Sequence, residues 1–367
     1  MSLIKIAGRI RQTVTLNMAD NSPSSGSSSD RTGESGDQPL DLLSLRDMVR
    51  LKVHHGPKGF INPFSNGHGN FREVLSWKLL HKNEFKHLYI NEKRRAVKVD
   101  WTAVKAHDGA AVTFIKHSTI LIKTNNRYIL VDPIFNGISK LIPDFSPLGF
   151  DLSEMPQPSH VLITHGHYDH LDMRSLSSLP PDSYVVTPLG YNYVFNGARY
   201  RRTQLDWFDS LNDDGLRITF LPCNHWTMRN PLLGPNRSLW GSFLLEMENG
   251  PIIFISGDSA YFDRYAELGR EFKPDLAIFN LGAYEPRWFM KKSHMNPEEA
   301  VRSFLELDAE KLMITHWGTF RLGDEPAYAP PLDLRRVMER ERLLDRLVHV
   351  EHGQTVFYQG RSIERVS

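Results

Sequence analysis

The sequence contains one cysteine, Cys223, in 367 residues. A single cysteine excludes a disulfide within the chain and excludes a zinc site built from several thiolates. It is compatible with a reducing compartment. An excess of charge of one sign is also missing, because 44 Lys and Arg residues balance 43 Asp and Glu residues to a formal net charge of +1. We therefore predict no nucleic-acid partner, since neither a global field nor a basic stripe is present.

Long apolar runs are absent as well, and no stretch approaches the roughly 18 residues that a transmembrane helix needs. The N-terminal sequence MSLIKIAGRIRQTV carries charges where a secretory signal needs a continuous apolar segment. With 40% hydrophobic and 24% charged residues, the composition is that of an ordinary globular protein. An intracellular protein without a secretory signal or a transmembrane helix is the expectation.

Residues 1–40 differ in composition from the rest of the chain. Lys5, Arg9 and Arg11 are interleaved with Leu and Ile, and the first 18 residues contain no acidic side chain. This pattern is compatible with a basic amphipathic helix on an anionic membrane, with an organelle-targeting sequence, or with a solvated terminus. Residues 21–38 are rich in Ser and Gly and predict a disordered linker. We expect one catalytic domain over residues 41–367, beginning with a helical extension.

The predicted domain alternates short β-type runs with helical patterns. The helical segment 40–55 either packs on the domain, which we favour, or faces a membrane with Arg46, Arg50 and Lys52. Strands are predicted at 111–115, 119–123, 127–131, 159–164, 183–187, 217–221, 242–247, 251–256, 275–281 and 311–315. Helices are predicted at 172–179, 262–270, 296–307 and 331–345, the third with Asn296 as its N-cap. This order predicts a layered α/β protein in which helices cover sheets.

The segment THGHYDHLD, residues 164–172, concentrates metal-ligand side chains directly after an apolar strand. In an extended chain residues two apart point the same way, so His165 and His167 can hold one ion. Asp169 and His170, where the chain turns toward the next helix, can face a neighbouring ion. Neutral imidazole and carboxylate ligands suit zinc, iron or manganese.

Three later residues stand in the same strand-then-ligand context, namely His225, Asp258 and His316. A single such histidine would be an ordinary structural residue, but four strand ends that carry ligand types in one chain predict a metal site. The remaining histidines, such as His54, His55, His81 and His87, lack this context and are predicted to lie at the surface.

The ligand order H-x-H-x-D-H followed by His, Asp and His resembles the metallo-β-lactamase superfamily. The resemblance implies an αββα sandwich with a dinuclear metal site at one edge. Carried onto this sequence, the first metal is held by His165, His167 and His225, and the second by Asp169, His170 and His316. Asp258 would bridge the two ions. The implied cofactors are two Zn²⁺ ions per chain, with iron or manganese not excluded, and Asp169, Asp258 and His316 are the implied catalytic residues.

Longer motifs are similar, in order, to the N-acylphosphatidylethanolamine-hydrolysing phospholipase D family. They are GFINPF, VDPIF, HGHYDHLD, LWGS, GDSAYF, LGAYEPRWFMKKSHMNPEEAV and HWGTF, between about residues 58 and 353. The resemblance implies hydrolysis of N-acylphosphatidylethanolamine to N-acylethanolamine and phosphatidate, by attack of a metal-bridging hydroxide on phosphorus. It also implies a phospholipid substrate and peripheral association with a membrane surface, and it leaves a homodimer open. The sequence departs from the family pattern at Lys116 and at Ser293.

Several side chains beside the ligands are candidates for substrate contact. The predicted contacts are Tyr168, Tyr284, Arg287, Trp288 and His294. Arg287 offers a cation for phosphate, and the alternative is a structural ion pair with Glu285 or another carboxylate. Tyr168 either faces the substrate or packs inside.

Two polar and two aromatic residues have competing interpretations. Asp132 either orients a ligand imidazole or belongs to a turn before proline. His117 lies either at the site or in a structural hydrogen bond. Trp226 and Trp240 are expected in the core rather than at a ligand.

The sequence leaves rival functions open. One is another hydrolase of the same superfamily, such as a sugar-phosphate lactonase or a general phosphodiesterase, which would have the same metal ligands. A rival of a different class is an inactive, membrane-associated binding protein. A complete set of seven ligands favours an enzyme over that second rival.

Overall fold

In the computed structural model, residues 42–65, 71–124, 127–197 and 200–367 are described. The basic N-terminal segment and the Ser/Gly-rich stretch of residues 1–40 lie outside the described residues, so the roles predicted for them stay predictions.

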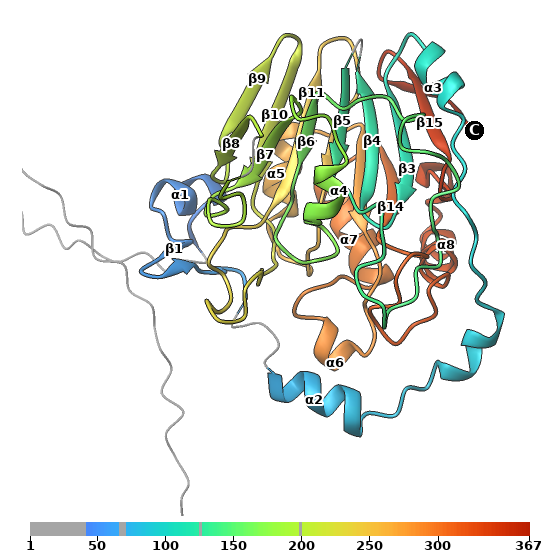
Figure 1. The fold of residues 1–367 in the computed structure, drawn as a ribbon. Coiled ribbons are helices and arrows are strands. Elements are labelled where there is room, and N and C mark those ends of the chain that lie inside the picture. Colours follow the sequence, from blue (N-terminus) through green and yellow to red (C-terminus); the bar gives the residue numbers. More distant parts are fainter. Residues whose placement is uncertain (1–41, 66–70, 125–126, 198–199) are drawn as a thin grey trace, which may run out of the picture.

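Two mixed sheets form the centre of the domain (Figure 1). The larger sheet has eight strands in the order β16-β15-β3-β4-β5-β6-β7-β8. These strands are β3 (Ala111–Lys116), β4 (Thr119–Thr124), β5 (Arg127–Val131), β6 (His160–Leu162), β7 (Tyr184–Pro188), β8 (Arg202–Leu205), β15 (Thr355–Gln359) and β16 (Ser362–Val366). The smaller sheet has six strands in the order β14-β13-β12-β11-β10-β9. They are β9 (Ser210–Asp213), β10 (Leu216–Leu221), β11 (Ser242–Met247), β12 (Ile252–Ile255), β13 (Leu276–Asn280) and β14 (Lys311–Thr315).

Helices cover the outer faces of both sheets and extend beyond one end of them (Figure 1). They are α1 (Leu45–Arg50), α2 (Phe71–Leu80), α3 (Trp101–Ala106), α4 (Met173–Ser177), α5 (Tyr265–Phe272), α6 (Arg287–Met290), α7 (Pro297–Leu307) and α8 (Pro330–Arg340). Two 3₁₀ helices, η2 (Lys86–Asn91) and η3 (Leu344–Arg346), and a ribbon of β1 (His55–Gly56) with β2 (Gly59–Phe60) complete the elements of the described residues. The fold is an αββα sandwich, as predicted.

The inner strands β3, β4 and β6 of the larger sheet are buried on both faces because both faces are covered. Along β4, Ile120 and Ile122 belong to the large core that includes the smaller sheet, α5 and α7. Leu121 between them belongs to the other core, with Trp101 of α3 and Leu176 of α4. Alternate residues of one strand therefore hold two separate layers together.

All ten predicted strands are present, with ends shifted by a few residues. In the two large sheets four strands were missed: β8, β9 and β16, which are largely polar edge segments, and β15, which pairs with β16. The two-residue strands β1 and β2 of the separate ribbon were not predicted either. Helix α7 has Asn296 as its N-cap in a capping box, as predicted. The helix predicted at 331–345 ends at Arg340, and η3 follows after a turn.

The predicted helix 40–55 is helical only at Leu45–Arg50, and it packs on the domain. Leu45 and Met48 are buried, and the Leu45 amide donates to Glu267 of α5 at 2.8 Å. The membrane-facing alternative for this segment is therefore wrong.

The prediction of a surface position is also wrong for His54. Its ring is fully buried and stacks on Trp207 at 4.3 Å. The Asp206 carboxylate is shared by His54, His55 and Lys52 and also accepts from the Trp207 amide. Because every acceptor position of this carboxylate is used and Lys52 balances its charge, the cluster joins the extension to the sandwich without needing a metal.

Candidate metal centre

The predicted ligands converge because the strands that precede them end at one edge of the sandwich. In the smaller sheet β10 and β12 both run antiparallel to β11, and β12, β13 and β14 are parallel. His225, Asp258 and His316 follow β10, β12 and β14, so they emerge at the same edge. His165 and its neighbours follow β6 of the larger sheet. The structure brings all seven predicted ligands together in two adjacent groups, which are linked by the contact between His170 and Asp258.

The first group contains three imidazole nitrogens that face one another. Nδ1 of His167 lies 2.9 Å from Nε2 of His165 and 3.4 Å from Nε2 of His225. The Nδ1 atoms of the other two rings carry protons. That of His225 donates to the Ser293 carbonyl at 3.0 Å, and that of His165 lies 3.0 Å from the Thr164 hydroxyl, which itself donates to Asp132. Two Nε2 lone pairs therefore point at His167, an arrangement that a shared cation stabilises.

The second group consists of Asp169, His170 and His316, with His117 beside them. Nε2 of His170 and Nε2 of His316 each lie 3.6 Å from Asp169 Oδ2. Nε2 of His117 lies closer to the same oxygen, at 3.0 Å. His117 is thus placed in the site by its contact with a predicted ligand.

Asp258 lies between the two groups. Its Oδ2 atom is 3.2 Å from His170 Nε2 and 3.7 Å from His165 Nε2, and its Oδ1 atom is 3.3 Å from His316 Nε2. Nδ2 of Asn280 donates to Oδ1 at 2.8 Å and so holds the carboxylate in place. One carboxylate within reach of both groups has the position that a bridging ligand requires.

Asp132 orients the imidazole of His170 in the second group, which is the first of the two interpretations given for it from the sequence. Its Oδ2 atom accepts from Nδ1 of His170 at 2.7 Å and from the hydroxyl of Thr164 at 2.6 Å. Since Nδ1 of His170 carries a proton, Nε2 presents its lone pair to the site. Asp132, His117 and His316 also have left-handed backbones, with φ of 42°, 49° and 69°. Such strain in non-glycine residues is typical of functional sites.

Burial and mutual charge decide the protonation of the groups. Burial lowers the pKa of His165 and His225 well below the usual value and lowers that of His167 to about 4, so these rings are neutral. Burial would raise the pKa of Asp258, but His170 and His316 lower it well below its usual value. The first group therefore consists of neutral imidazoles beside an ionised Asp258, which are the forms that bind metals. Burial also lowers the pKa of His170 and His316, but Asp258 and Asp169 outweigh it, raising the pKa of His170 well above its usual value and that of His316 to about 9. Metal binding at these two rings would therefore release protons.

Buried ring nitrogens without hydrogen bonds test whether this donor set fits a metal. Within this centre they are His117 Nδ1, His167 Nε2, His170 Nε2 and both ring nitrogens of His316. Unpaired buried nitrogens are rare and call for a ligand or an ion. Two of them, on His170 and His316, face Asp258, so the donor set fits divalent metal ions.

A cavity of about 520 Å³ opens over this centre. Its polar lining comes from His167, Asp169, Asp258, His294 and Ser293. Its apolar lining consists of Val74, Trp226, Met228, Pro235, Ala283, Phe289, Met290 and Leu322. Val74, Met228 and Leu322 were not predicted, and their segments have no sequence pattern that would single them out.

Trp226 was expected in the core, and this expectation is wrong. Its ring lies 4.8 Å from that of His167 and lines the cavity, and its indole N–H donates to the Ser293 hydroxyl. Trp240 is fully buried, as expected.

Of the five predicted substrate contacts, only His294 lines this cavity. Its Nδ1 atom lies 4.0 Å from Asp258 Oδ2. Tyr168 is 57% exposed, and its hydroxyl donates to the Arg229 carbonyl rather than facing the cavity. Trp288 is also exposed and does not belong to the cavity lining.

Tyr284 and Arg287 need a larger correction. Tyr284 is 4% exposed, and its hydroxyl donates to Asp333 of α8 at 2.6 Å, because the residue follows β13 into the core. Arg287 donates to both carboxylate oxygens of Glu299, at 3.0 and 2.8 Å, and to the His294 carbonyl at 2.9 Å. The structural alternative for Arg287 is thus correct, with Glu299 in place of Glu285 as its partner.

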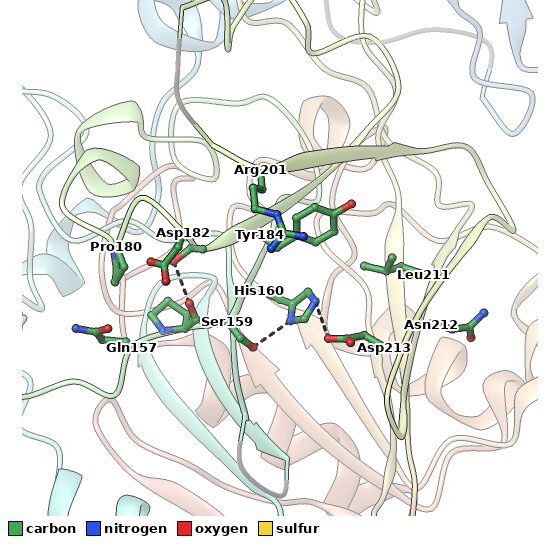
Figure 2. Close-up of a pocket in the computed structure, with 12 residues that line it drawn as sticks. Gln157, Ser159, His160, Pro180, Asp182, Tyr184, Arg201, Leu211, Asn212 and Asp213 are labelled. Atoms are coloured by element: carbon green, nitrogen blue, oxygen red, sulfur yellow. Dashed lines mark hydrogen bonds and ion pairs between the residues drawn. The ribbon is translucent and has the colours of Figure 1, made fainter.

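A second cavity, of about 570 Å³, lies at the other end of β6 (Figure 2). His160 is buried between Ser159, whose hydroxyl is 3.0 Å from Nδ1, and Asp213, which is 3.4 Å from Nε2. The backbone N–H of Ser159 donates a hydrogen bond to the Tyr128 carbonyl. This Ser–His–Asp chain therefore has no free amide at the serine to stabilise an oxyanion, and we assign it no catalysis.

Comparisons with known proteins agree with this geometry. Residues 127–317 match the β-lactamase superfamily domain. The chain is 31% identical over 272 residues to the mitochondrial N-acyl-phosphatidylethanolamine-hydrolyzing phospholipase D of Saccharomyces cerevisiae, a match that covers 69% of this chain and 58% of that relative. It is 31% identical to N-acyl-phosphatidylethanolamine-hydrolyzing phospholipase D 1 of Caenorhabditis elegans, over 68% of this chain and 76% of that relative. Isothiocyanate hydrolase from Delia radicum gut bacteria shares the fold, with a TM-score of 0.56 and 19% identity over 68% of this chain and 99% of that one.

Proposed function

This chain belongs to the β-lactamase superfamily and, within it, to the N-acylphosphatidylethanolamine-hydrolysing phospholipase D family, and we propose that it cleaves the headgroup phosphodiester of N-acylphosphatidylethanolamine. The products would be N-acylethanolamine and phosphatidate. The observation that supports the proposal is a cluster of seven candidate metal ligands, three of which (His167, Asp169 and Asp258) line a mostly apolar cavity.

Two ions, proposed to be zinc, would be held by the two groups. His165, His167 and His225 would hold the first, Asp169, His170 and His316 the second, and Asp258 would contact both. Such a pair of ions supplies activated water and neutralises charge on a phosphoryl oxygen. We assign catalytic roles to Asp169, Asp258 and His316 on this basis.

The residues of the chain provide the orientation. Asn280 and Asp132 hold Asp258 and His170 in fixed positions. His294 faces the same space from the cavity wall, so it is placed to contact the phosphate or the alcohol that leaves. Phe289, Met290 and Leu322 supply apolar surface suited to acyl chains, whereas a sugar phosphate would gain little from them.

We propose that the mouth of this cavity faces a membrane. Figure 1 shows α2 and α6 together beyond one end of the sheets, and both helices contribute cavity-lining residues. Large apolar side chains are exposed on these two helices and on η2, which follows α2 in the chain: Leu75, Leu79 and Leu80 on α2, Leu88 and Ile90 on η2, and Trp288 on α6. Exposed apolar side chains of this size beside an apolar cavity favour contact with lipid.

Among the described residues, no helix is long and apolar enough to cross a membrane. Peripheral association is therefore the form of membrane contact that we propose. The name of the yeast relative includes the word mitochondrial, and the basic segment with Lys5, Arg9 and Arg11 is our candidate for organelle targeting.

The test is incubation of the purified protein with a panel of headgroup-labelled phospholipids, followed by separation of the products by mass spectrometry. We expect N-acylethanolamine and phosphatidate from N-acylphosphatidylethanolamine and slower turnover of phosphatidylcholine. Faster turnover of a soluble phosphodiester or of a lactone would favour another hydrolase of the superfamily. Metal-loaded protein that binds the lipid without turnover would favour the binding protein.

A further inference from the structure

The segment Tyr284–Glu299 reaches the metal centre through its backbone. The Ser293 carbonyl accepts from Nδ1 of His225 at 3.0 Å. A carbonyl can only accept, so this contact fixes the proton of His225 on Nδ1 and leaves Nε2 for a metal. The adjacent residue, His294, lies with its ring 5.6 Å from that of His225. The position of the Ser293 peptide therefore controls one ligand of the first group.

Arg287 ties this segment together. Its Nη2 atom donates to both oxygens of Glu299, at 3.0 and 2.8 Å. Its Nη1 atom donates to the His294 carbonyl at 2.9 Å and lies 3.4 Å from the Tyr284 carbonyl. One guanidinium thus joins the first residue of the segment, the residue after Ser293 and the helix α7. No lysine has the forked geometry to make these contacts at once.

Glu299 is a fixed anchor because it belongs to the capping box of α7. The Asn296 side chain accepts from the Glu299 amide at 2.9 Å, and the Glu299 carboxylate accepts from the Asn296 amide at 3.2 Å. Ala300 and Phe304 of the same helix are fully buried. The side chains of Arg287 and Glu299 are 23% and 33% exposed, so directional hydrogen bonding contributes more than raw charge attraction.

We propose that Arg287, with Glu299, is a positioning residue for His225, acting through the Ser293 carbonyl on the first metal group. The inference rests on the proposed metal centre. It replaces the expectation that Arg287 contacts phosphate. Loss of the clamp would let the Ser293 peptide move, and His225 would lose the partner that orients its ring. Partners of this kind change metal affinity by about 10- to 100-fold when they are removed. Arg287 acts on His225 indirectly, through the hydrogen bond to the His294 carbonyl, so we expect its loss to weaken metal affinity by about tenfold, the lower end of this range.

The experiment compares R287A, R287K and E299Q with the wild type. E299Q keeps a side chain that can cap α7 but removes the charge that Arg287 binds. R302A is the matched control, because Arg302 makes an exposed ion pair with Glu306 on the same helix. The readouts are the affinities of both sites for Zn²⁺, by competition with a chromogenic chelator, and the visible absorption of the Co²⁺-substituted protein.

We expect R287A and E299Q to lower the affinity of one of the two sites for Zn²⁺ by about tenfold and to change the absorption spectrum of the Co²⁺-substituted protein. R287K should give values between those of these variants and the wild type. R302A should match the wild type in both readouts. A folded R287A with wild-type affinities and spectrum would overturn the inference. If R287A does not fold, a folded E299Q with wild-type affinities and spectrum would overturn the inference. A wild type that binds fewer than two metals would overturn the proposed centre itself, which is a distinguishable failure.

Discussion

The carboxylate of Asp132 accepts a hydrogen bond from Nδ1 of His170 at 2.7 Å, while its other contacts are the amide and hydroxyl of Thr164 at 2.8 and 2.6 Å. All three partners are donors. An amide at position 132 would put its NH₂ group either against the Thr164 amide or against both the Thr164 hydroxyl and Nδ1 of His170, so it could not hold Thr164 and His170 as the carboxylate does.

We expect D132N to lower the affinity for the second metal by about 10- to 100-fold. The matched control is D213N, which alters the His160–Asp213 pair at the other end of β6. The measurement is metal competition with a chelator at neutral pH. Equal affinities for D132N and D213N would show that Asp132 does not orient His170.

Metal content tests the dinuclear arrangement directly. Purified protein should carry close to two transition-metal ions per chain, and H225A or H316A should each remove about one of them, because each contributes to a different group. Both variants should lose hydrolysis. Elemental analysis by mass spectrometry gives the count, and full activity after complete chelation would contradict the proposal.

An exposed leucine of α2 tests the membrane face. Leu79 is 70% exposed, so L79S should change the free energy of unfolding by no more than about 0.5 kcal/mol. Burying a leucine side chain fully contributes about 1.5–3 kcal/mol, so partial insertion should change vesicle affinity by severalfold. L332S, at a 59% exposed position on α8, is the control. Sedimentation with phospholipid vesicles measures both, and equal binding of the two variants would argue against α2.

Glu325 gives a pH dependence with a definite sign. Burial raises the pKa of Glu325 from 4.5 to about 7, although its oxygens accept from the amides of Tyr284 and Glu285. The folded state therefore holds a proton that the unfolded state releases, so the free energy of unfolding should fall as pH rises from 4.5 to 7 and level off above 7.

The difference between the wild type and E325Q isolates this effect. The loss of stability between pH 4.5 and 7 should be smaller in E325Q by about 1–3 kcal/mol. Urea unfolding at a series of pH values measures it. Parallel curves for the two proteins would mean that Glu325 is ionised throughout.

Gly282 tests the close packing behind His316. A Cβ atom at this position would lie 2.2 Å from the His316 carbonyl oxygen and 3.2 Å from its Nδ1 atom. G282A should therefore lower the free energy of unfolding by about 1–3 kcal/mol and displace His316. G137A is the control, since its Cβ would meet nothing within 4 Å. Thermal unfolding with and without added Zn²⁺ separates the loss of stability from the loss of metal binding.

The sequence by itself determined the chemistry of the centre and most of the layered fold. Apolar runs of strand length predicted ten strands, and ligand side chains directly after four of them predicted where a metal would bind. These signals are local, because a few residues are enough to predict where a strand ends. The ligands then meet because the four strands that precede them end at the same edge of the sandwich. The edge strands β8, β9 and β16 were missed because their partly exposed segments lack such runs.

Only the tertiary structure decided which side chains after those strands face the site. Tyr284 and Arg287 stand between two predicted active-site elements, yet one donates to α8 and the other to α7. Val74 of α2 lines the cavity although it precedes the nearest predicted ligand, His165, by 91 residues in the sequence (165 − 74). The direction of a side chain in a loop depends on partners that are distant in sequence, and the gain from burying Tyr284 or pairing Arg287 with Glu299 exists only once those partners are in place.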